Sequence, residues 1–314
     1  QGAIRCHPFV LKEIAATREQ DHAAASQAFD AAFWGHVRFT VGNAARSLWL
    51  GLTGGRLARV PGGAETKRYY RQLGWLAAGF ALVADVAMLF LGGNLKRKER
   101  LSARLGDILS QLYLASATLK RHEDDGRQQA DLALVHWALE DALVQIQQAF
   151  YGVFENFPNR LAARTMRLLV FPWGRVFRAP EDLLGHQIAK LMMEPSEARD
   201  RLTGNTFIYR RDEDPVGRLE LALEAAPTAD AIEAKLRAAA KAATVTGLTD
   251  EERLDSAVDK GILGRDEAAN LRRFWKLRWA CIMVDDFPQD VGRAAVVARD
   301  SATAPVFQSA RKTA

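Results

Sequence analysis

Hydrophobic residues recur every three or four positions along much of this chain, a spacing that predicts α-helices. Three stretches show it most clearly. Their apolar positions are Phe29, Phe33, Val37, Val41, Ala44 and Leu48; Leu101, Leu105, Ile108, Leu112, Ala115 and Leu119; and Leu132, Val135, Leu139, Leu143, Ile146, Phe150 and Val153. No series of short alternating segments with hairpin turns is visible, so the pattern predicts an all-α fold.

Glycine, proline and polar residues separate the predicted helices and suggest how the chain is organised. Gly51–Gly55, His122–Arg127 and Asn156–Pro158 end the three helices in turn. Ser196 and Asp214 are predicted N-caps, and Pro215 occupies the first helical position after Asp214. Thr249 and Glu252 match a capping box, which also predicts a helix start. We expect residues 1–20 to end a preceding helical domain, 21–211 to form a helical bundle, 212–286 to form a smaller helical module and 287–314 to form a loose tail.

The apolar run from Leu73 to Gly93 carries one charged residue, Asp85, and is long enough to cross a bilayer. An acidic group near the centre of a membrane span costs roughly 2.5–3.5 kcal/mol on insertion scales. A helix buried among other helices has the same all-round apolar composition. We therefore predict a buried helix in which Asp85 faces a basic or hydroxyl partner. A transmembrane or an interfacial helix remains the alternative.

Composition and charge describe an ordinary globular chain. Apolar residues make up 48% and charged residues 26% of the 314 residues, and the net charge is +5. This excess permits an anionic partner, but its distribution does not predict nucleic-acid binding. Two distant cysteines, Cys6 and Cys281, form no disulfide framework, so we expect a cytoplasmic protein. The start at Gln1 rather than Met predicts the back part of a longer chain.

Two basic segments are candidate membrane-contact sites. The first contains Lys96, Arg97, Lys98, Arg100 and Arg104, and is interpreted either as a solvated helix start or as a surface for anionic lipid. The second, residues 160–178, has no acidic residue and mixes arginines with apolar and aromatic side chains, which is typical of interfacial segments. Its predicted membrane-contact residues are Arg160, Arg164, Arg167, Trp173, Arg175 and Arg178. The alternative is a connector whose apolar side packs on the bundle.

Motifs for catalysis are scarce. The six histidines occur in no HExxH or CxxC-paired pattern, and we expect His36 and His136 to be structural rather than metal ligands. Gly51–Gly63 is glycine-rich but lacks the Gly-Lys-Ser/Thr ending of a phosphate-binding loop. His122–Asp125 is interpreted as a solvated corner. The residues themselves therefore identify no catalytic, cofactor or metal site.

Several segments together resemble the C-terminal region of the long, bacterial type of acyl-CoA dehydrogenase. The most informative is Leu91–Ala115 with the apolar run before it, and Gln1–Phe9 resembles the junction shortly after that family's catalytic glutamate. The other segments, in the family's order, are Lys120–Gly126, Phe171-Pro-Trp-Gly174, Pro195–Arg201 and Val284–Phe287. The resemblance covers nearly the whole chain.

The resemblance implies an FAD enzyme of fatty acid β-oxidation that oxidises fatty acyl-CoA to trans-2-enoyl-CoA. In that family the glutamate base and the FAD contacts precede the position of Gln1, so this chain alone is expected to be inactive. The resemblance also implies an electron-transfer flavoprotein or similar acceptor, a homo-oligomer, and a cytoplasmic location with peripheral contact with the inner membrane. The alternative is a non-enzymatic helical module that binds a membrane surface or a partner protein.

Overall fold

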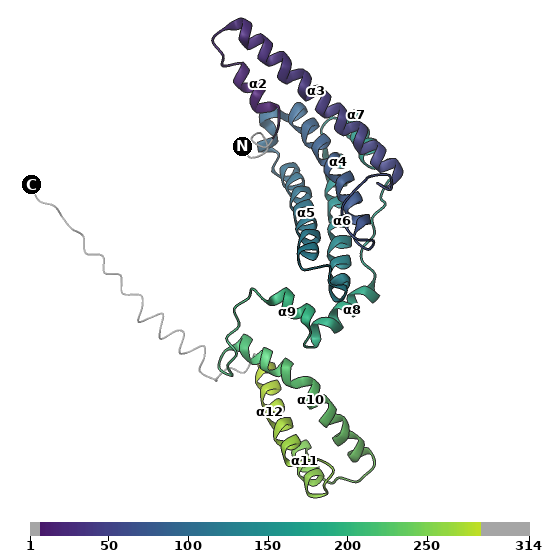
Figure 1. The fold of residues 1–314 in the computed structure, drawn as a ribbon, viewed down its shortest axis with the longest axis vertical. Coiled ribbons are helices and arrows are strands. Elements are labelled where there is room, and N and C mark those ends of the chain that lie inside the picture. The colour runs from purple at the N-terminus through teal and green to yellow at the C-terminus, as the bar shows by residue number, and fades with distance from the viewer. Residues whose placement is uncertain (1–6, 284–314) are drawn as a thin grey trace, which may run out of the picture. The chain divides into compact units, whose positions relative to one another are not determined.

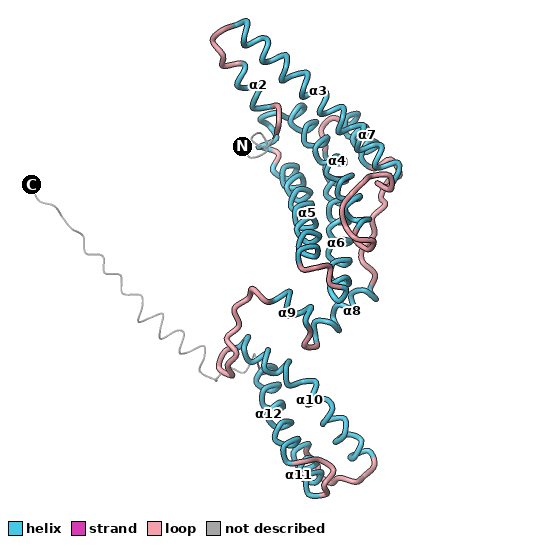
Figure 2. The backbone as a smooth tube through the Cα atoms, in the orientation of Figure 1, coloured by secondary structure: helices cyan, strands magenta, loops and turns pink. Residues whose placement is uncertain are grey.

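The computed structural model describes residues 7–283, and this part of the chain consists of helices and loops without any strand (Figures 1 and 2). The predicted all-α fold is confirmed. The chain divides into two compact units, residues 1–190 and residues 191–314. Cys6, the Val284–Phe287 segment and the predicted tail over 287–314 lie outside the described residues.

The first unit is built around two long antiparallel helices and the apolar helix that packs against them. Helices α5 (Glu99–Asp124) and α6 (Leu132–Asn156) form a hairpin, and α4 (Lys67–Leu91) packs against α3, α5 and α7. The remaining elements are α2 (Val10–Ala16), α3 (His22–Thr53), the 3-10 helices η1 (Gly92–Arg97) and η2 (Gln129–Asp131), α7 (Arg160–Val170) and the start of α8 (Asp182–Met193).

The apolar stripes of α5 and α6 form the centre of this unit. Every predicted position of both stripes is buried, from Leu101 to Leu119 on α5 and from Leu132 to Val153 on α6. The stripe of α3 behaves differently, because Phe29, Phe33 and Val41 are exposed. Helix α3 instead buries Leu50 and the small residues Ala32, Ser47 and Gly51.

Helix α4 contains the long apolar run. The stretch Lys67–Arg97 is the one candidate in the described part of the chain that is long and apolar enough to cross a membrane. In its most apolar 18 residues, 44% are buried inside the protein. Its packing on three neighbouring helices agrees with the predicted core helix. Two residues near its end, Leu89 and Phe90, remain exposed.

A ring cluster joins α4, α6 and the end of α7. The ring of Phe171 lies 5.6 Å from those of Trp75 and Phe150 and 5.5 Å from that of Tyr151. The indole N–H of Trp75 donates to the backbone oxygen of Val170 at 2.8 Å. Small residues permit this approach, because a Cβ atom at Gly79 would lie 2.8 Å from Val170 Cγ1.

The second unit packs α10 (Pro215–Lys241) against α12 (Arg265–Ile282), with α11 (Asp250–Asp259) beside both and α9 (Glu197–Thr203) preceding them. The predicted helix starts are confirmed, because Ser196, Asp214 and Thr249 all accept backbone N–H bonds as N-caps. Its core includes Ile232, Leu236, Leu254, Leu271 and Phe274. Arg199 and Glu220 form a largely buried ion pair that raises the pKa of Arg199.

Candidate functional site

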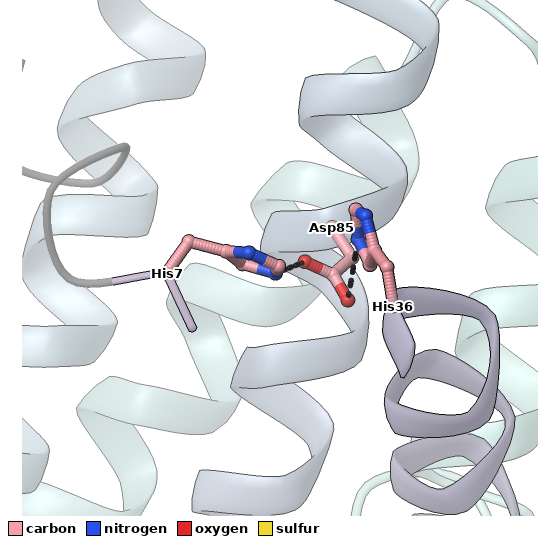
Figure 3. A group of neighbouring side chains, drawn as sticks. All are labelled: His7, His36 and Asp85. Carbon is pink, nitrogen blue, oxygen red and sulfur yellow. Dashed lines mark hydrogen bonds and ion pairs between the residues drawn. The ribbon is translucent and has the colours of Figure 1, made fainter. Parts of the chain in front are cut away.

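Three polar side chains converge where the chain before α2 meets helices α3 and α4 (Figure 3). They are His7, His36 and Asp85, and each offers one nitrogen or oxygen atom within 4.8 Å of the others. The residues lie far apart in the sequence, so only the packing of the three segments brings them together. They form the candidate site of the first unit.

Asp85 is the centre of the cluster. Its side chain is buried, yet both carboxylate oxygens have partners. Oδ1 accepts from His7 Nε2 at 2.8 Å, and Oδ2 accepts from the Thr40 hydroxyl at 2.8 Å. A carboxylate in an apolar surrounding requires such donors to stay charged. The predicted basic or hydroxyl partner of Asp85 is thereby confirmed.

The hydrogen bonds of His7 determine where its proton lies. Its Nδ1 atom accepts from the backbone N–H of Phe9 at 3.2 Å and of Val10 at 3.1 Å. In a neutral imidazole the accepting nitrogen carries no proton, so the proton is on Nε2 and points to Asp85. His7 therefore holds Asp85 and satisfies two N–H groups at the start of α2.

His36 lies between two carboxylates. Its Nδ1 atom donates to Glu13 Oε1 on α2 at 2.8 Å, and its Nε2 atom lies 3.8 Å from Asp85 Oδ2, which is too long for a hydrogen bond. In neutral His36 the Nε2 atom is a hydrogen-bond acceptor. It therefore faces Asp85 Oδ2, a second acceptor, without a hydrogen between them. A proton on His36, or a donor from outside the protein, would join them.

The residue types of this cluster suit a metal ion, but its hydrogen bonds do not. A histidine that binds a metal through Nε2 donates its Nδ1–H to a second partner. The Nδ1 atom of His7 instead faces two backbone donors. Binding a metal at His7 would break the hydrogen bonds at the start of α2. The cluster is better suited to hold a hydrogen-bond donor or a proton.

An apolar cavity of about 690 Å³ opens beside the cluster. Its walls come from α2, α3 and α4 and from the glycines after α4. His36, Thr40 and Asp85 form its polar part, whereas the rest of the lining is apolar, namely Val10, Phe33, Val37, Val41, Val86, Met88 and Leu89. The stripe predicted on α3 thus lines a cavity rather than the core.

The polar residues Arg68, Tyr69, His136 and Glu140 form a second cluster, between α4 and α6. Tyr69 bonds to His136 Nδ1 at 2.9 Å and to Glu140 at 3.1 Å, and Arg68 pairs with Glu140 at 2.6 Å. Burial raises the pKa of Tyr69 well above its usual value and lowers the pKa of His136. Both groups stay neutral near pH 7, and the network holds two helices together.

The predicted membrane-contact residues all lie on the surface of the first unit. Arg160, Arg164 and Arg167 are exposed on α7, whose opposite face buries Ala163, Met166 and Val170 against the bundle. This packing corresponds to the connector interpretation. Leu161 and Leu168, which directly follow Arg160 and Arg167, are also exposed. The basic side of α7 can contact an anionic surface, but its buried side is not free to insert.

The segment after α7 carries the other three predicted residues. Trp173 is 69% exposed and donates to the backbone oxygen of Leu52 at 3.2 Å. Arg175 lies over the ring of Tyr151 at 4.4 Å and pairs with Glu155 at 3.5 Å. Arg178 is exposed and lines the cavity beside the Tyr69 network. Contacts with the bundle therefore hold Trp173 and Arg175.

The other basic segment surrounds η1 and the start of α5. Lys96, Arg97, Lys98 and Arg100 are exposed, as expected of a solvated helix start, and Arg104 is half-buried. The end of α5 differs from the interpretation of His122–Asp125 as a solvated corner. His122 is buried, whereas Asp124 and Asp125 are exposed and pair with Lys120 and Arg121. Only the acidic part of this segment is therefore solvated.

Comparison with known protein families gives one clear match. The family model described as acyl-CoA dehydrogenase, C-terminal, bacterial type, matches residues 4–287. No solved structure matches the chain significantly.

Proposed function

The chain belongs to the bacterial-type C-terminal family of acyl-CoA dehydrogenases, and we propose that it is the helical end of an FAD-dependent enzyme that oxidises fatty acyl-CoA to trans-2-enoyl-CoA. The match over residues 4–287 is the observation that supports this proposal. The proposed partners are a fatty acyl-CoA substrate, an electron-transfer flavoprotein or similar acceptor, and further copies of the same chain. The proposed process is fatty acid β-oxidation in the cytoplasm.

The apolar cavity beside His36 and Asp85 does not fit FAD. Asp85 places a carboxylate at the polar part of this cavity and Glu13 places another beside it, and these charges repel a diphosphate. We therefore derive no catalytic step from this chain. The glutamate base and the flavin site are proposed to lie upstream in the complete enzyme, and the helical chain is proposed to support them.

A spectrum of the complete gene product tests this function. We expect flavin absorption bands that bleach when palmitoyl-CoA is added, because substrate oxidation reduces the flavin. The 314-residue chain supplied with FAD serves as the control and should retain no flavin after gel filtration. A folded complete protein that binds no FAD, or whose bands stay unchanged with acyl-CoA, would contradict the proposal.

A second proposed function is peripheral contact with the inner membrane through α7. The supporting observation is the exposed set of Arg160, Arg164 and Arg167, together with the exposed residues Leu161 and Leu168. A basic residue near an anionic surface contributes about 1 kcal/mol of attraction. This function is compatible with an enzyme and also with a non-enzymatic helical module.

Changing Arg164 and Arg167 together to Glu should weaken binding to vesicles that contain anionic lipid. The loss of two attractions of about 1 kcal/mol each lowers the affinity about 30-fold or more. Co-sedimentation with phosphatidylglycerol vesicles at low salt measures this loss.

The matched control carries Arg265→Glu and Arg273→Glu, which make the same change of net charge at exposed positions of α12. If the control loses as much affinity as the α7 variant, overall charge rather than α7 determines binding. Unchanged binding of the α7 variant would remove this surface from consideration.

A further inference from the structure

The cavity between α2, α3 and α4 has the shape and charge of a ligand site. We propose that it binds a single-chain amphiphile with a primary ammonium head, whose alkyl chain fills the cavity while the head lies between His36 and Asp85. This ligand goes beyond the proposed function, because it is neither a flavin nor an acyl-CoA thioester.

The size and lining of the cavity favour an alkyl chain. Its volume of about 690 Å³ lies within the roughly 300–1,000 Å³ of small-molecule sites. Val37 and Val41 of α3 and Val86 and Leu89 of α4 all line it. Each methylene group that leaves water for such a surface raises affinity about fourfold. The chain therefore supplies affinity, and the polar part of the cavity selects the head group.

The charges around the polar part favour a cation. Asp85 is buried there, and Glu13 of α2 holds the far nitrogen of His36. His7 contributes no charge, because its Nδ1 atom accepts two backbone N–H bonds. Among the described residues, no lysine or arginine forms an ion pair with Asp85 or Glu13. A carboxylate head would be repelled by both acidic side chains.

The hydrogen-bonding geometry distinguishes an ammonium from an alcohol. His36 Nε2 and Asp85 Oδ2 are separated by 3.8 Å and both accept when His36 is neutral. Asp85 Oδ2 retains acceptor capacity beyond its bond from Thr40. An ammonium nitrogen about 2.8 Å from each atom can donate to both, since it has three N–H groups. A hydroxyl has one donor and leaves one acceptor unpaired.

Calorimetric titration of the purified chain with octylamine, octanol and octanoate, each below its micelle-forming concentration, tests the proposal. At pH 8 we expect octylamine to bind at least tenfold more tightly than octanol and octanoate to bind most weakly. Equal affinities for the amine and the alcohol would overturn the charge-based head preference. Tightest binding of octanoate would also overturn it, and no binding of octylamine would overturn the site itself.

Two variants locate the bound molecule. Val37→Trp fills the cavity without changing its polar groups and should reduce octylamine affinity at least tenfold. Ala45→Trp adds the same side chain at an exposed position of α3 outside the cavity and should leave the affinity unchanged. Wild-type affinity in Val37→Trp would show adsorption of the amine elsewhere and would overturn the proposal.

The flavin spectrum of the complete enzyme depends on none of these outcomes.

Discussion

Asp85→Leu should lower the free energy of unfolding of the first unit by about 2–4 kcal/mol. The carboxylate is buried and accepts from His7 Nε2–H and from the Thr40 hydroxyl. Leucine has a similar size but accepts no hydrogen bond, so both donors lose their partner. His7 is the more costly of the two, because its ring is nearly inaccessible to water. Urea denaturation followed by circular dichroism measures the change.

Asp85→Asn is the matched control for this prediction. Its side-chain oxygen can accept from His7, and its amide can donate to the Thr40 hydroxyl, which rotates to accept. We expect the Asn variant to lose less than half of what the Leu variant loses. A Leu variant as stable as the wild type would contradict the core position of α4. It would instead favour the membrane-spanning alternative, in which removing a buried charge stabilises the helix.

The long helices could be predicted from the sequence because their surroundings are simple. On α5 and α6 one face meets the core and the other meets water, so the apolar positions recur at helical spacing and are all buried. The starts of α9, α10 and α11 were equally predictable, because an N-cap bond is made within a few residues of the chain. Both kinds of signal are local.

The packing of α3 could not be predicted in this way. Its large apolar residues, including Phe33 and Val41, are exposed or line the cavity, whereas its buried face contains Ala32, Ser47 and Gly51. Small residues allow helices to approach closely, but they contribute little to a hydrophobic pattern. The pattern therefore identified the helix correctly without identifying its buried side.

Only one part of the candidate site, Asp85, could be predicted from the sequence. A single acidic residue within an apolar run indicated that Asp85 has a partner, since an unpaired buried charge is costly. The identity of that partner depends on how the chain before α2 and helix α3 align against α4. No periodicity encodes this alignment. His7 was therefore missed, and His36 was expected only to be structural.

Phe171→Ala should destabilise the first unit by about 3–5 kcal/mol, the usual cost of removing a fully buried aromatic side chain. Phe171 is completely buried, and its ring contacts those of Trp75, Phe150 and Tyr151. The cavity left behind cannot close easily, because these neighbours belong to two long helices that are fixed by other contacts. Urea denaturation and the near-ultraviolet signal of Trp75 report the loss.

The neighbouring residue of the same Phe171-Pro-Trp-Gly174 segment provides the control. Trp173 is 69% exposed and donates a hydrogen bond to the backbone oxygen of Leu52, so Trp173→Ala should cost less than about 1 kcal/mol. The two substitutions distinguish a buried residue from an exposed residue within the segment Phe171–Gly174. Phe171 anchors the segment to the core, whereas most of the Trp173 side chain is exposed and can contact a surface. Similar stability losses in both variants would contradict this division and would make Trp173 part of the packing as well.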